Sequence, residues 1–75
     1  MKNELKLQMI RRARLARGLV NLLRDDVECI NIDADTFDLF NIAESIIEAR
    51  TTVNKINANL DELVALVGMS KKDRK

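Results

Sequence analysis

Two glutamates four residues apart, Glu44 and Glu48, have the spacing that could most directly support chemistry. In a helix both carboxylates would lie on one face, where they could share a proton or bind a cation. The chain has no histidine and only two glycines, so neither a His-activated nucleophile nor a glycine-rich phosphate loop can be assembled. A solvated face beside basic partners is the preferred interpretation of the pair. We expect no catalytic, cofactor or metal site, no small-molecule substrate, and a protein that is not an enzyme.

Cys29 is the only cysteine. A single thiol excludes an internal disulfide and the ligand spacing of a zinc finger. No histidine is available to activate the thiol, and a small apolar residue at a turn is the simpler interpretation. We expect a reducing, cytoplasmic location. We expect no membrane partner, because no uncharged apolar run approaches the roughly 20 residues of a membrane span.

An arginine cluster in the first third of the chain is the best candidate for binding an external ligand. Guanidinium groups match phosphates well, which makes nucleic acid a possible partner. The only aromatic residues are Phe37 and Phe40, so a stacking platform for single strands is absent. Acidic residues elsewhere in the chain could pair with the same arginines instead. The candidate phosphate contacts are Arg11, Arg14, Arg17 and Arg24.

The near-neutral net charge hides strong segregation. Residues 1–24 carry seven basic residues and one acidic residue, whereas residues 25–48 carry eight acidic residues and no basic one. Residues 49–67 are balanced, and the last residues are again basic. The chain is therefore a basic block, an acidic block and a short basic tail, a pattern that can orient helices against each other.

A heptad pattern gives these residues their framework. Nine apolar positions between Leu39 and Val67 recur every seven residues in two series offset by three. Such a seam, sustained over four repeats, is typical of a long helix that packs along another helix. The first series is Leu39, Ile46, Val53, Leu60 and Val67, and the second is Ile42, Ala49, Ile56 and Leu63.

The remaining elements follow from local signals, and the pattern predicts one helical domain over residues 1–75. A broad apolar stripe predicts a first helix at about 3–27, with Arg12 inside the stripe and so needing to pair or to extend into solvent. β-Branched residues and an acidic turn cluster favour a connection at about 28–35. A capping arrangement at Asp35 and Asp38 places a second helix at about 36–67. Gly68 would then be the first residue after the helix and would begin a basic tail at 68–75.

We therefore predict an all-α fold in which a two-helix antiparallel hairpin dimerises into a four-helix bundle. In this hairpin Arg17 and Arg24 would lie near Glu44 and Glu48. The longer second helix would project beyond the first and leave apolar surface for a second chain. The residues expected at the oligomer or partner interface are Phe37, Leu39, Phe40, Ile42, Ile46, Val53, Ile56, Leu60, Leu63, Val64 and Val67.

A second architecture starts at Ile30. The segment from Ile30 has a possible short strand, a helix, a turn near Arg50 and a helix opening with Thr52-Val53-Asn54. It resembles ribbon-helix-helix repressors, in which paired strands of a dimer enter the DNA major groove. The resemblance implies a strand at about Glu28–Asp33, after an added N-terminal helix. It would place Cys29, Asn31 and Asp33 toward the bases and Thr52 as a helix cap.

The function expected from these patterns is a homodimeric helical interaction protein, such as an adaptor, an assembly factor or a small regulator. Its apolar seam would bind another protein. The alternative is a nucleic-acid-binding regulator that uses either the basic face of the first helix or a ribbon-helix-helix strand.

Overall fold

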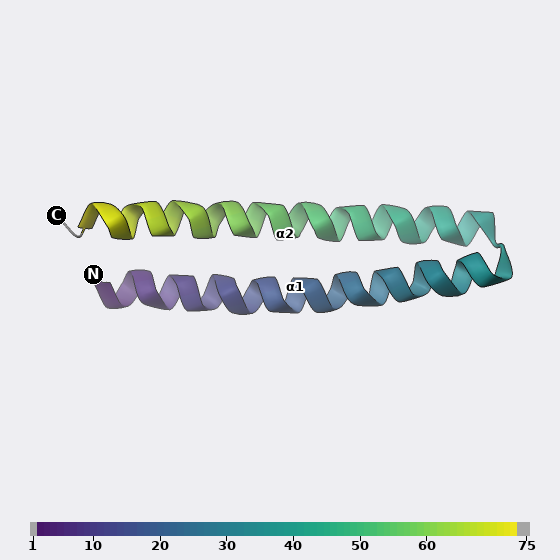
Figure 1. Cartoon of the computed structure of the whole chain (residues 1–75), viewed down its shortest axis with the longest axis horizontal. Helices are drawn as coiled ribbons and strands as arrows, with labels where there is room; N and C mark the ends of the chain where they lie inside the picture. The colour runs from purple at the N-terminus through teal and green to yellow at the C-terminus, as the bar shows by residue number, and fades with distance from the viewer. Residues whose placement is uncertain (1, 74–75) are drawn as a thin grey trace.

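The computed structural model describes residues 2–73 as two helices packed antiparallel (Figure 1). Helix α1 spans Lys2–Thr36 and helix α2 spans Leu39–Asp73, each 35 residues long. The hairpin measures 57 × 14 × 11 Å, and its N- and C-terminal ends lie together, opposite the turn. Residues 2–73 contain no strand. The predicted all-helical hairpin is confirmed for this part of the chain.

The turn after α1 is a Schellman motif formed without glycine. The Phe37 amide donates to the Ala34 carbonyl and the Asp38 amide donates to the Asp33 carbonyl, both at 3.1 Å. These two bonds satisfy carbonyls that the end of a helix leaves open. Phe37 has a φ of 55°, a left-handed conformation that costs a residue with a Cβ about 1–2 kcal/mol.

Helix α2 begins with Asp38 as its N-cap. The Asn41 amide donates to Asp38 Oδ1 at 3.2 Å, and the Asn41 side chain donates to Asp38 Oδ2 at 2.8 Å. The carboxylate thus satisfies an amide of the first turn, where negative charge is also favourable. The predicted cap at Asp35 is wrong by three residues, and the helix starts at Leu39 rather than near residue 36.

The predicted connection at 28–35 is helical, and the first helix ends at Thr36 rather than near residue 27. The β-branched residues that favoured an extended segment lower helix propensity by only fractions of a kcal/mol. Ile30 and Asp33 extend the four- and three-residue spacing of the residues that face α2. Tertiary packing along this face outweighs the weak local preference. Thr36 Oγ1 also donates to the Asp33 carbonyl at 3.1 Å in the last turn.

The ribbon-helix-helix alternative is wrong, because its strand at Glu28–Asp33 lies inside α1 and its turn near Arg50 lies inside α2. Thr51 donates its hydroxyl to the Ile47 carbonyl at 3.0 Å, and Thr52 Oγ1 lies 3.1 Å from the Glu48 carbonyl, both within the continuous helix. Thr52 is therefore not a cap. Similarly, Gly68 does not follow α2, which continues to Asp73. Of the predicted tail, residues 68–73 are helical, and residues 74–75 lie outside the described part.

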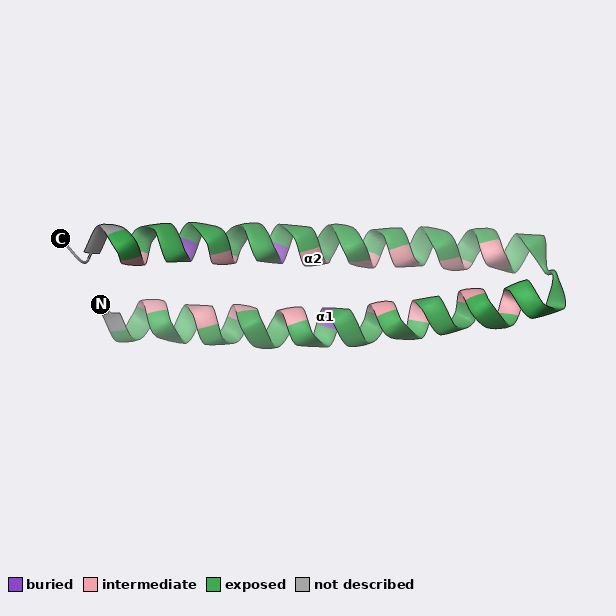
Figure 2. Ribbon diagram, viewed as in Figure 1, coloured by how far each residue is buried: buried purple, intermediate pink, exposed green. Residues whose placement is uncertain are grey.

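The two helices meet along a single seam of partly buried residues (Figure 2). On each helix these residues are spaced alternately by four and three positions, the spacing that keeps one helix face toward its neighbour. On α1 they are Leu5, Met9, Arg12, Ala16, Leu19, Leu23, Asp26, Ile30 and Asp33; on α2 they are Ile42, Ser45, Ala49, Thr52, Ile56, Asn59, Leu63, Leu66 and Ser70.

The seam has one apolar side and one largely polar side. On the polar side the helices are joined by hydrogen bonds: Ser45 Oγ to Asp33 Oδ2 at 3.0 Å and Thr52 Oγ1 to Asp26 Oδ2 at 2.9 Å. Leu5, Leu19 and Leu66 interrupt this polar row. The apolar side consists of Met9, Ala16, Leu23 and Ile30 from α1 and Ile42, Ala49, Ile56 and Leu63 from α2.

Arg12 and Asn59 form the most buried of these polar links. Asn59 is 4% exposed, and its amide nitrogen donates to the Arg12 carbonyl at 2.8 Å. The Arg12 guanidinium in turn donates to Asn59 Oδ1 at 3.5 Å. The sequence predicts that Arg12 either pairs or extends into solvent, and the structure shows that it pairs. The link also fixes which residues of the two helices lie opposite each other.

Candidate interaction surface

An exposed strip of apolar residues, here called the apolar flank, lies beside the apolar side of the seam. Each of its residues except Leu39, at the start of α2, follows a seam residue by four positions and so lies next to it on the helix surface. On α1 the strip contains only small and β-branched residues. On α2 its aliphatic residues remain exposed, Val53 least and Leu39 most. The apolar flank consists of Ala13, Val20, Val27 and Ala34 from α1 and Leu39, Ile46, Val53, Leu60 and Val67 from α2.

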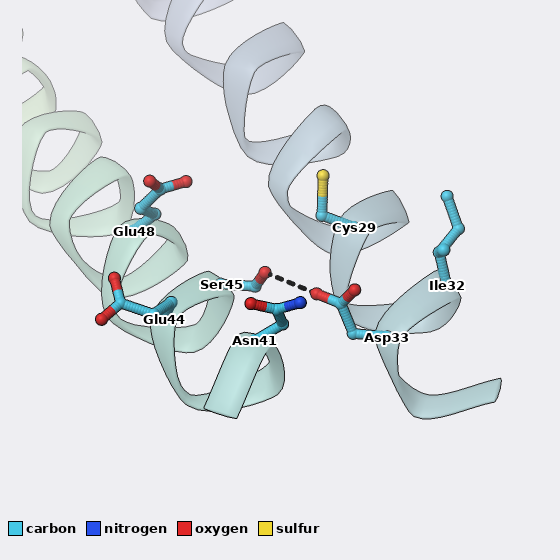
Figure 3. A pocket seen from close by; sticks show the side chains of 7 residues that line it. All are labelled: Cys29, Ile32, Asp33, Asn41, Glu44, Ser45 and Glu48. Carbon is cyan, nitrogen blue, oxygen red and sulfur yellow. Dashed lines mark hydrogen bonds between the residues drawn. The ribbon is translucent and has the colours of Figure 1, made fainter. Parts of the chain in front are cut away.

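The opposite side of the hairpin, here called the polar flank, combines charged residues of α2 with exposed apolar residues of α1, among them Leu15, Leu22 and Ile32, and carries shallow open hollows. One hollow near the turn is lined by Cys29 and Asp33 of α1 and by Asn41, Glu44 and Glu48 of α2 (Figure 3). A second is lined by residues that include Leu15, Lys55 and Glu62. Because residues of both helices border these hollows, they share one side. The apolar flank therefore occupies the other side of the hairpin.

The eleven predicted interface residues separate into three groups. Ile42, Ile56 and Leu63 lie in the seam and pack against α1 of the same chain. Phe37, Phe40 and Val64 are highly exposed, and Phe37 is part of the turn. The other five lie on the apolar flank: Leu39, Ile46, Val53, Leu60 and Val67.

Helix α1 packs against only one of the two heptad series that the sequence predicts on α2. The series through Ile42 faces α1, whereas the series through Leu39 does not. In its place α1 packs against Ser45, Thr52 and Asn59. Sequence reasoning missed these polar residues because it searched the seven-residue repeat for apolar side chains only. The hydrogen-bonding partners Asp26 and Asp33 repeat at the same spacing on α1, and this matching polar series was the available signal.

The predicted projection of α2 beyond α1 does not occur, because the two helices have equal length. Leu63 and Leu66 face α1, and Leu66 is among the most buried residues of the chain. The apolar flank, which extends along the hairpin, is therefore the continuous open apolar strip of α2, and single apolar residues such as Leu15, Leu22 and Ile47 are exposed elsewhere.

The four candidate arginines are exposed on α1. Arg11, Arg14, Arg17 and Arg24 do not belong to the seam, unlike Arg12. The prediction that Arg17 lies near Glu44 and Glu48 is wrong, because the turn lies further along the chain than expected. The Ser45–Asp33 and Thr52–Asp26 bonds place this part of α2 beside residues 26–33 instead.

The two ends of the hairpin carry opposite charge. Since the turn lies at residues 37–38, the acidic block at residues 25–48 folds back on itself and forms the turn half of the molecule. Its eight carboxylates have no lysine or arginine among them. The other half of α1 carries Lys6, Arg11, Arg12, Arg14, Arg17 and Arg24 against Glu4. Charge is thus separated along the long axis.

The residues singled out for chemistry meet in the hollow near the turn. Cys29 is exposed and lies in the same hollow as Glu44 and Glu48. The carboxylates of the two glutamates do not point toward each other (Figure 3). Ser45 and Asp33 hydrogen-bond across the floor of this hollow. Among the side chains that the structure describes, at residues 3–71, no group of three histidine, cysteine, aspartate or glutamate residues is arranged to hold a metal ion.

The architecture defines a class of structure, the antiparallel two-helix hairpin with one apolar flank. Neither helix, over its described residues, has a stretch apolar and long enough to cross a membrane. No protein-family model, curated protein or solved structure matches the chain.

Proposed function

We propose that this protein is a non-enzymatic helical interaction protein that self-associates through its apolar flank to form a four-helix bundle. The observation that supports this most strongly is the exposure of five aliphatic residues of α2, which share a flank with Val20 and Val27 of α1. A second hairpin laid on this flank would cover the strips of both helices at once. The apolar side of the seam would then lie in the interior of the bundle.

The small core of a single hairpin supports the same proposal. Leu19 and Leu66 are the only buried apolar residues among those described, at 8% and 6% exposure. No described side chain is fully buried. Burying an aliphatic side chain contributes about 1.5–3 kcal/mol, whereas ordering each residue costs a comparable amount. Chains of this size commonly gain the missing burial by association.

A charge placed on the apolar flank tests the proposal. Val53→Glu introduces a carboxylate at the middle of the proposed interface, where burial without a partner is unfavourable. We expect the wild-type chain to have twice the mass of one chain in light scattering. The variant should dissociate about 100-fold more readily, which corresponds to about 2.7 kcal/mol.

Asn54→Glu is the matched control, because it adds the same charge at the next residue, on an exposed part of α2 outside the flank. This variant should retain the wild-type mass. A wild-type chain that is a stable, folded monomer at high concentration would contradict the proposal. Equal effects of the two variants would contradict the assignment of the flank.

Nucleic-acid binding is the second candidate function, and the exposure of the arginines favours it. Arg11, Arg14 and Arg17 lie in the half of α1 away from the acidic turn. Their guanidinium groups are therefore open to phosphates along the backbone of a duplex. Binding of this kind is dominated by counterion release and weakens steeply with salt.

The matched test compares two triple variants that remove the same charge from different helices. Replacing Arg11, Arg14 and Arg17 by alanine should abolish binding to a double-stranded RNA or DNA probe at low salt. Replacing Arg50, Lys55 and Lys71 by alanine should leave most of it. An absence of binding by the wild-type chain at low salt, or equal losses in both variants, would eliminate this candidate.

A further inference from the structure

We infer that the partner on the apolar flank is a second copy of this chain in the reverse orientation, with the acidic turn end of each hairpin beside the basic end of the other. This inference rests on the proposed self-association and specifies its geometry. The chemical basis is the separation of charge along the 57 Å length of the hairpin.

Two symmetric arrangements bring the apolar flanks of two copies together. In the parallel arrangement both turns lie at the same end, and α1 of one copy packs on α2 of the other. In the reversed arrangement the turns lie at opposite ends, and α1 packs on α1 while α2 packs on α2. Both use the same surface on each copy, as a two-fold interface requires, so burial of apolar area does not distinguish them.

Charge does distinguish them. The parallel arrangement would bring two acidic blocks together, each with eight carboxylates and no basic residue. Axes of packed helices lie about 8–10 Å apart, but Glu44 and Glu48 border the hollow on the polar flank, away from the second copy. The repulsion between the two blocks is therefore partly screened at physiological ionic strength, where the Debye length is about 8 Å, and grows as the salt concentration is lowered.

In the reversed arrangement the basic half of each α1 lies at the same height along the bundle as the acidic half of the other. If the two α1 helices cross at their common midpoint, near Leu19, residues before the midpoint lie beside residues after it in the other copy. Lys6 then lies at the level of Asp33, and Arg11 at the level of Glu28. On α2, Arg50 lies at the level of Asp61, because the midpoint of that helix is near Ile56.

A series of labels on one face of α1 tests the orientation. Asn21, Glu28 and Asp35 are spaced by seven residues and are exposed, so labels at these positions differ mainly in height along the helix. Each position would be replaced singly by cysteine in a Cys29→Ser background and spin-labelled. Electron–electron distances between the two copies of the dimer would then be measured.

The reversed arrangement predicts separations along the axis of about 6, 27 and 48 Å for Asn21→Cys, Glu28→Cys and Asp35→Cys, at 1.5 Å per residue from the midpoint. The measured distance should therefore rise in that order, by at least about 20 Å over the series. The parallel arrangement predicts three nearly equal distances. The position 21 label is the internal control, since both arrangements keep it near the middle of the bundle.

The outcomes separate the two levels of the proposal. A dimeric mass with three equal distances would overturn the reversed orientation and leave self-association intact. A monomeric mass with no distance between copies would overturn self-association itself. If one labelled variant fails to fold, the other two still give the slope of distance against position.

Discussion

At the scale of single residues, the turn is the most unusual feature of the hairpin. Phe37 occupies the left-handed position that glycine or asparagine usually fills, and its ring is 71% exposed. The strain is therefore not offset by burial of the ring within one chain. Phe37, in the left-handed conformation, ends α1, and Asp38 caps the start of α2. Together these two residues reverse the direction of the chain.

Phe37→Gly and Phe37→Ala separate conformational strain from loss of the ring. Both variants remove the aromatic side chain, but only glycine adopts the left-handed conformation without penalty. We expect the glycine variant to be more stable than the alanine variant by about 1 kcal/mol. Thermal unfolding at one protein concentration measures this difference. Equal stabilities would contradict the positive φ of residue 37.

Asp38→Ala removes the N-cap of α2. Loss of the bonds to the Asn41 amide and side chain should lower the free energy of unfolding by about 0.5–2 kcal/mol. Asp35→Ala is the control, because it removes the same charge close by without removing a cap. A comparable loss in both variants would indicate that the charge of the turn matters more than the cap.

At the scale of the helices, both glycines lie inside continuous helix. Gly18 is near the middle of α1 and Gly68 near the end of α2, neither has a positive φ, and a Cβ at either position would meet no atom within 4 Å. Alanine can therefore replace glycine at both sites without a steric clash or a change of backbone conformation.

Gly18→Ala should stabilise the protein by about 0.5–1 kcal/mol, because alanine loses less conformational freedom in a helix. Gly68→Ala should also be stabilising rather than destabilising. Chemical denaturation of each variant provides the measurement. Destabilisation by Gly68→Ala would favour the sequence-based prediction that Gly68 follows the helix in a left-handed conformation.

At the scale of the whole molecule, the proposed dimer couples folding to association. The apolar flank and the small core of a single hairpin have the same cause, since the aliphatic residues of α2 divide between two helix faces and α1 covers only one. If the second copy covers the other, the midpoint of thermal unfolding must depend on protein concentration.

Each tenfold increase in concentration should stabilise the folded dimer by about 1.4 kcal/mol and raise the unfolding midpoint. Circular dichroism melts over two decades of concentration would measure this dependence. The Val53→Glu variant should show a lower midpoint with little dependence on concentration. A wild-type midpoint that does not move with concentration would contradict the coupling.

The sequence by itself determined the helical class, the long second helix and the seven-residue spacing of its apolar side chains, because periodicity is a local property of the chain. The position of Arg12 within an apolar stripe predicted that it would pair or extend into solvent, and the structure shows that it pairs with Asn59. The position of the turn did not follow, because the weak helix propensity of residues 28–35 suggested a connection there, whereas packing against α2 keeps them helical.

Only the tertiary structure decided which side chains face each other. The turn lies at residues 37–38 rather than at 28–35, so the residues that face each other across the two helices differ from those predicted. Asp26 faces Thr52, and Asp33 faces Ser45. The polar pairing of these residues rotates α2 relative to the predicted seam, and its Leu39-to-Val67 series is left on the surface. The same shift gathers the acidic block at one end. The flank and the charge separation both arise from the register between the helices, which depends on contacts between residues far apart in the chain.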